Sequence, residues 1–218
     1  MKIATITPTR GDRREFLAQC RRMIHRQTLP PDEVIFVNFP AKPGIKDITL
    51  RYKKGIEEAV QRGCDVAFFI EDDDWYHPQY IEWMVRMWKA NGCPDLFGVE
   101  ETYYYHLKIQ NLWHSTHLGR SSAFCTMVNL KFEGMNWPED SDPFTDMWIW
   151  REWKCKKACI KFDREEIYTI GVKHGIGLTG GSGHANNIRW TMLKAQNWFN
   201  SKINQIDAQF YNKIRNLI

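Results

Sequence analysis

The chain has 218 residues and is 43% hydrophobic, which is enough to bury a substantial core. Its 30 lysines and arginines against 26 acidic residues leave a net charge of +4, and no stretch reaches the roughly 18 uncharged apolar residues of a membrane helix. We therefore expect no integral membrane segment, and because residues 1–10 do not read as a signal peptide, we expect a cytoplasmic protein. The 6 cysteines form no C-x-x-C pair and are expected to be reduced thiols.

The net charge conceals an asymmetry along the chain. Residues 1–150 carry 18 basic and 21 acidic side chains, a net charge of −3, whereas residues 151–218 carry 12 and 5, a net charge of +7. An acidic part suits a metal ion, and a basic part suits phosphates or a polyanion. The alternative for the lysines is an ordinary solvated surface.

The first 92 residues alternate between apolar strands and amphipathic helices. Strands are predicted at residues 2–7, 33–39 and 66–70. Helices are predicted at residues 16–27, at residues 46–62 and after Pro78. This order predicts an α/β fold with a mostly parallel, Rossmann-like sheet and helices on both of its faces.

The pattern changes after Gly92. Residues 96–133 are rich in aromatic and β-branched side chains and are predicted to be strands and loops. A helix is predicted at 144–156 and a late strand at 166–172, followed by a glycine-rich loop at 175–183. Residues 187–217 are predicted to form an amphipathic C-terminal helical tail.

Four consecutive acidic residues, Glu71 to Asp74, follow directly after an apolar strand. Adjacent carboxylates repel one another by roughly 1 kcal/mol per pair even in water, so a fold tolerates them best beside a cation. Carboxylate oxygens suit hard cations such as Mg²⁺ or Mn²⁺, and ligands bind at the carboxyl ends of parallel strands. The alternative is an acidic turn that caps the next helix.

Residues 65–81, DVAFFIEDDDWYHPQYI, resemble the DxD segment of GT-A glycosyltransferases, especially those of the inverting family 2. Residues 6–10, 16–17, 27–30 and 33–37 are similar to the first β-α-β unit of that family. The resemblance covers about residues 1–180 and implies a GT-A fold. It divides residues 1–185 into a nucleotide-sugar-binding half, 1–92, and an acceptor half, 93–185, followed by the tail at 186–218.

The resemblance implies a divalent cation, Mn²⁺ or Mg²⁺, and a nucleoside-diphosphate-sugar donor. Asp73 would be the direct metal ligand, although Asp72-x-Asp74 also fits the motif. Glu71 or Asp72 would contact the donor ribose or a metal-bound water. The residues that would border the nucleotide are Thr7, Pro8, Thr9 and Arg10. The family often has two aspartates where this chain has Asn38 and Phe39, which leaves the identity of the base open.

The segment around Asp146 resembles the family motif that carries the general base. Asp146 would therefore take the proton of the acceptor hydroxyl, and it falls in a first helical turn, where the helix dipole stabilises a carboxylate. The alternative is a helix-start aspartate without a catalytic role. Glu139, Asp140 and Asp142 are nearby candidates for the same task.

Further candidates lie in the late strand, the glycine-rich loop and the aromatic segments. The resemblance implies that Lys173 contacts the donor and that His174 contacts the metal or the diphosphate. Gly180, Gly181 and His184 would belong to a mobile loop over the donor. Candidates for an acceptor surface or lid are Trp75, Tyr103, Tyr105 and Trp113, for which core packing is the alternative.

The sequence thus predicts a metal-dependent glycosyltransferase that inverts the anomeric carbon. One candidate acceptor is a hydroxymethylated pyrimidine in DNA, because compact transferases of this kind resemble those encoded by some bacteriophages. The other is a bacterial surface glycan or lipid-linked precursor. A phosphoryl or nucleotidyl transferase and a non-catalytic protein that binds nucleotide sugars or nucleic acid are the alternatives from other classes.

Overall fold

The computed structural model describes residues 1–40, 46–162, 166–175 and 192–218. A six-stranded central sheet has the order β2-β1-β3-β8-β5-β9. All neighbouring pairs are parallel except those of β8, which runs antiparallel to β3 and β5. The strands are β1 (Ile3–Thr9), β2 (Glu33–Asn38), β3 (Val66–Phe69), β5 (Leu96–Val99), β8 (Thr126–Asn129) and β9 (Lys157–Ile160).

Helices cover both faces of this sheet because its central strand is apolar on both sides. Along β3, Phe68 belongs to the core that contains α1 (Arg14–His25) and α3 (Tyr80–Ala90). The next residue, Phe69, points the other way, into the core shared with α2 (Ile48–Gln61) and α4 (Thr145–Glu152). This two-sided burial is typical of the parallel sheets of α/β proteins.

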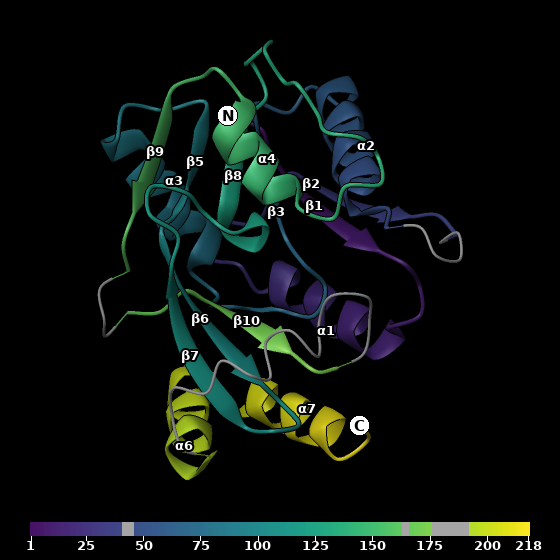
Figure 1. The fold of residues 1–218 in the computed structure, drawn as a ribbon, viewed down its shortest axis with the longest axis vertical. Helices are drawn as coiled ribbons and strands as arrows, with labels where there is room; N and C mark the ends of the chain where they lie inside the picture. The colour runs from purple at the N-terminus through teal and green to yellow at the C-terminus, as the bar shows by residue number, and fades with distance from the viewer. Residues whose placement is uncertain (41–45, 163–165, 176–191) are drawn as a thin grey trace.

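A second, four-stranded sheet has the order β4-β10-β6-β7. Its strands are β4 (Trp75–Tyr76), β10 (Thr169–Lys173), β6 (Glu101–His106) and β7 (Asn111–Thr116). The C-terminal helices α6 (Met192–Lys202) and α7 (Gln205–Arg215) lie beside β6, β7 and β10, at the lower end of the view in Figure 1. Their packing is aromatic, because Tyr105 of β6 stacks on Phe199 of α6 with 4.1 Å between ring centroids.

The predicted α/β fold with a mostly parallel sheet is confirmed. The predicted C-terminal helical tail is also confirmed, and it consists of two helices: α6 ends at Lys202, and Asn204 begins α7 by accepting a hydrogen bond from the backbone N–H of Asp207. The predicted helix at 144–156 ends at Glu152, since Trp153 is extended, and β9 follows unforeseen.

The part of the chain that the structure describes contains no helix long and apolar enough to cross a membrane. Most of the glycine-rich loop, and the predicted domain boundary at residue 185, lie outside the described residues.

Candidate active site

The acidic residues 71–74 form the turn between β3 and β4, at the carboxyl edge of the central sheet. The backbone N–H of Glu71 donates to the hydroxyl of Tyr76 at 2.8 Å, which closes the turn. The side chains of Asp72, Asp73 and Asp74 are all buried, at no more than 7% exposed. An acidic turn that merely caps a helix would be solvated, so this burial favours a ligand site.

The geometry of this turn fits a hard cation. One carboxylate oxygen from each of Glu71, Asp73 and Asp74 can be chosen such that all three lie within 4.8 Å of one another. Oδ1 of Asp74 accepts from the backbone N–H of Val172 at 2.7 Å, whereas its Oδ2 is buried and has no hydrogen-bond partner among the described residues. Buried polar atoms are normally paired, and oxygen donors of this kind suit Mg²⁺ or Mn²⁺.

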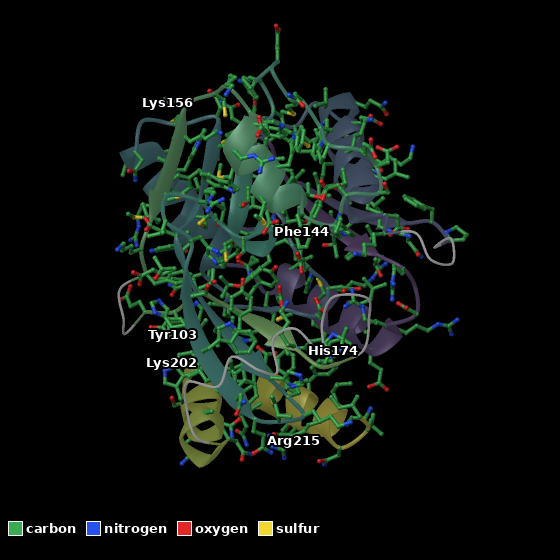
Figure 2. All side chains as sticks on the ribbon, viewed as in Figure 1. Tyr103, Phe144, Lys156, His174, Lys202 and Arg215 are labelled. Carbon is green, nitrogen blue, oxygen red and sulfur yellow. The ribbon has the colours of Figure 1, made fainter. Side chains whose placement is uncertain are left out.

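His174, just past the end of β10, joins this cluster. Its Nε2 lies 2.9 Å from Oδ2 of Asp73, although 100 residues separate the two in the sequence. The imidazole packs against the ring of Phe16 in α1, with centroids 4.4 Å apart and the ring planes tilted by 31°, and is 1% exposed. Figure 2 shows His174 at the end of β10, next to α1. A carboxylate and an imidazole are both common ligands of divalent metal ions, and this contact holds one of each side by side.

Lys173 contributes a cation to the same edge. Burial disfavours its charged form, but the carboxylates of Asp74, Glu71 and Asp73 outweigh that effect and raise its pKa above the ordinary value. Its ammonium also lies 5.4 Å from the ring centroid of Tyr104. Lys173 is therefore positively charged at neutral pH beside the acidic turn.

Arg13 is a site residue that the sequence reasoning missed. Its Nη2 lies 2.6 Å from Oδ1 of Asp72, an ion pair whose angles do not make a hydrogen bond. Its Nη1 donates a hydrogen bond to Oδ2 of Asp73. Arg10, the arginine predicted to border the nucleotide, instead pairs with Asp12 at 2.6 Å. The signal for Arg13 was its position just before α1, which follows the carboxyl end of β1.

The acids of the turn titrate in opposite directions because their partners differ. Burial raises the pKa of Asp72 to about 7, with the charge of Asp73 adding to the effect and that of Arg13 opposing it. For Asp73, burial acts in the same direction but is outweighed by the charge of Arg13 and the hydrogen bond from His174, which hold its pKa well below the usual range. Asp73 therefore stays ionised at neutral pH.

The predicted nucleotide-bordering residues lie on two neighbouring strands. Thr7, Pro8 and Thr9 are buried on β1, and Thr9 pairs in register with the exposed Asn38 of β2. Both strand ends are held by the buried guanidinium of Arg51, which donates to the carbonyl oxygens of Thr9, Val37 and Phe39 and pairs with Asp47 at 2.7 Å. This holds the carboxyl ends of β1 and β2 side by side.

Asp146 lies in the first turn of α4, as predicted, and lines a cavity of about 210 Å³. Burial raises the pKa of its carboxyl group, against the hydrogen bond that it accepts from the N–H of Met147 at 2.8 Å. Thr145, the residue before Asp146, is hydrogen-bonded to Thr49 of α2, and the hydroxyl of Tyr52 in the same helix donates to Glu71 at 3.3 Å, so the cavity lies near the acidic turn. The other residues that line it are Thr116, His117, Leu118, Arg120, Ser121 and Met147.

The alternative acids near Asp146 do not line this cavity. Asp142 accepts a hydrogen bond from the N–H of Phe144 at 2.7 Å, and Asp140 pairs with Lys53 at 3.7 Å. Glu139 is exposed. Asp146 is therefore the acid among these four that lines the cavity.

The predicted acceptor or lid aromatics are mostly core residues. Trp75, Tyr105 and Trp113 are no more than 5% exposed, which leaves no ring face for a ligand. Tyr103 is half-buried between His114 and Trp198, at centroid distances of 4.7 and 5.0 Å. Packing, the alternative reading of these aromatics, accounts for all four. Gly180, Gly181 and His184 lie outside the described residues.

Comparison with known structures shows which proteins share this fold. No family model matches the chain, and no curated protein matches it in sequence. The structure is similar to that of S. aureus TarS residues 1–349 in complex with UDP-GlcNAc, with a TM-score of 0.60 and 9% identity over 99% of this chain and 70% of that one. The complex of the same TarS fragment with UDP gives a TM-score of 0.54 at 10% identity, over 94% of this chain and 71% of that one. In a longer TarS structure, the match has a TM-score of 0.51 and 10% identity over 96% of this chain, but spans only 44% of that one. At these identities the likeness shows the fold, which is the GT-A fold.

Proposed function

We propose that this chain is a metal-dependent glycosyltransferase that transfers a sugar from a nucleoside diphosphate to an acceptor hydroxyl. The contact between Asp73 and His174 carries the proposal, because it joins an acidic turn and a distant strand end at the carboxyl edge of a GT-A sheet. The cavity beside Asp146 supports it, since a transferase needs a second site near the first. The S. aureus TarS structures that share this fold contain UDP-GlcNAc or UDP.

The residues that would hold a divalent cation are Glu71, Asp73, Asp74 and His174, with Asp72 beside them. Their oxygen and imidazole donors fit Mg²⁺ or Mn²⁺. Such an ion, when bound, supplies positive charge that stabilises a departing diphosphate.

The donor would lie along residues 1–92, with its diphosphate near two protein cations. Arg13 and Lys173 flank the acidic turn and can donate charge-assisted hydrogen bonds to phosphate oxygens. Thr7 to Arg10 and Asn38 would border the nucleoside, because the ends of β1 and β2 meet there. Asn38 offers both a donor and an acceptor to a base.

The acceptor would enter from residues 93–185, into the cavity at Asp146. The carboxylate of Asp146 takes the proton of the acceptor hydroxyl as its oxygen attacks the anomeric carbon. The bond from that carbon to the diphosphate oxygen breaks as the glycosidic bond forms. A single displacement of this kind inverts the anomeric configuration.

The first test is donor hydrolysis. The protein is incubated with a panel of nucleoside-diphosphate sugars and Mn²⁺, and slow release of nucleoside diphosphate is followed by chromatography. Release that stops in EDTA and in the Asp73→Asn variant supports the proposal. Release of pyrophosphate would indicate a nucleotidyl transferase, and binding without turnover, with or without candidate acceptors, would indicate a binding protein. Either result contradicts the transferase.

Two classes of acceptor are proposed, DNA and a bacterial glycan or lipid-linked precursor. The net charge of +7 in residues 151–218 supports a polyanionic acceptor such as DNA carrying hydroxymethylated pyrimidines. A bacterial surface glycan or lipid-linked precursor is the other acceptor.

A further inference from the structure

A buried carboxylate lies in the C-terminal helix, outside the acidic turn. Asp207 of α7 is 0% exposed. It accepts hydrogen bonds from the indole Nε1 of Trp75 at 2.9 Å and from the amide of Gln19 at 2.5 Å. Both of its oxygens lie 2.8 Å from Nη2 of Arg26, and Asn204 donates to it as well. A fully buried charge is costly unless it is paired in this way, so these contacts tie α7 firmly to α1 and to Trp75.

The partner Trp75 connects Asp207 to the acidic turn. Trp75 follows Asp74 directly, and β4 pairs antiparallel with β10, whose Thr169 hydroxyl donates to the Trp75 carbonyl at 2.9 Å. On the other side of the peptide, Oδ1 of Asp74 accepts from the backbone N–H of Val172 in the same strand. Asp207 of α7 thus holds the indole where the acidic turn enters β4, the strand that pairs with β10, and β10 ends just before His174.

A second route runs from α7 to His174 through aromatic rings. Phe210, one turn after Asp207, meets Phe16 of α1 edge to face, with ring centroids 5.8 Å apart. Phe16 in turn packs against the imidazole of His174, with ring centroids 4.4 Å apart. The acidic turn, through Trp75, and the imidazole of His174, through Phe16, are therefore each linked to the same C-terminal helix.

We propose that α7 positions the metal ligands, with Asp207 and Phe210 as positioning residues that act through Trp75 and Phe16. This inference rests on the proposed function, because it assigns the tail a role at the same site. Groups that orient the ligands of a metal typically change its affinity by about 10- to 100-fold when they are mutated. The tail is then part of the active site, although neither residue is within the acidic turn.

The test measures Mn²⁺ affinity of the full chain by isothermal titration calorimetry and by the EPR signal of free Mn²⁺. Asp207→Asn keeps the shape of the side chain but removes the charge, and is expected to weaken Mn²⁺ binding by about 10- to 100-fold. Trp75→Phe removes only the indole donor and is expected to act in the same direction. The double variant should lose less than the product of the two single effects, since both remove one contact.

Ile214→Val is the matched control, because it removes a buried methyl group from the same helix and leaves the Asp207–Trp75 and Phe210–Phe16 contacts in place. It should lower the melting temperature but leave Mn²⁺ affinity within about twofold. Unchanged affinity in Asp207→Asn and Trp75→Phe, with the wild type binding Mn²⁺, would overturn the inference and leave the metal site intact. If Asp207→Asn does not fold, Trp75→Phe and Phe210→Leu decide the question. A wild-type chain that binds no Mn²⁺ overturns the metal proposal, and the positioning role with it.

Discussion

At the residue scale, Arg13 and Arg10 stand in one loop but have different partners. Arg13 faces Asp72 and Asp73, whereas Arg10 pairs with the exposed Asp12. We predict that Arg13→Met weakens the binding of a nucleoside diphosphate in Mn²⁺ by about 10- to 100-fold, the equivalent of one charge-assisted contact. Arg10→Met, the matched control, should stay within about threefold. Calorimetric titration checks both variants. An equal loss of affinity in the two would mean that Arg10 contributes to nucleotide binding as much as Arg13 does.

Asp146 allows a prediction that separates binding from chemistry. Asp146→Asn should retain donor binding but reduce transfer by roughly 10²–10⁴-fold, the usual range for a general base. Asp142→Asn is the control, since Asp142 lies outside the cavity and its side chain accepts a hydrogen bond from the N–H of Phe144, just before α4. Steady-state kinetics check the loss, and NMR of the product checks the stereochemistry. A product with retained anomeric configuration would rule out this role for Asp146.

The environment of Asp146 also sets a pH dependence. Burial raises the pKa of this carboxyl group, so it stays protonated at pH values where an exposed aspartate is already ionised. A protonated carboxyl group cannot accept the hydroxyl proton. As the pH rises and Asp146 ionises, kcat/KM should therefore increase, and the midpoint of this increase should lie above pH ~4. A pH–rate profile checks this. This increase in kcat/KM with pH should be absent from the residual activity of the Asp146→Asn variant.

At the element scale, α2 packs directly on β1 because residue 55 is a glycine. A Cβ built there would lie 2.2 Å from Cγ2 of Ile6, far below a van der Waals contact. Gly55→Ala should therefore destabilise the fold by roughly 1–3 kcal/mol, even though alanine is the better helix former. Urea denaturation checks the loss. Lys54→Ala, an exposed change in the same helix, should stay within about 0.5 kcal/mol, and Ile6→Ala should partly rescue Gly55→Ala.

The element pattern was predictable where each segment has its own periodic signal. Within residues 2–90, each of the three strands and each helix between them has its own hydrophobic spacing, so their alternation can be read from the sequence. The break in the tail was missed because its apolar residues keep a helical spacing across Ile203, and only the cap at Asn204 ends that pattern. The strand Lys157–Ile160 was missed because its partner, β5, lies about 60 residues earlier.

At the scale of the whole molecule, the DNA-acceptor hypothesis makes a prediction about salt. The +7 of residues 151–218 should contribute phosphate contacts, and about four such contacts would lower DNA affinity by roughly 10²-fold between 50 and 200 mM salt. Fluorescence anisotropy with single-stranded and duplex DNA checks this, with and without donor. No binding at low salt would leave the glycan acceptor.

The sequence by itself determined the α/β alternation, the acidic turn after β3 and the place of Asp146 at a helix start. Each of these depends on neighbours within about ten residues, so it is readable as spacing and composition. The choice of Arg13 over Arg10 was decided only by the tertiary structure. So were the contact of Asp73 with His174 and the burial of Trp75 against Asp207. These contacts join residues 60 to 132 positions apart in the sequence. Local spacing does not show which of these distant side chains the fold will bring to the same edge of the sheet.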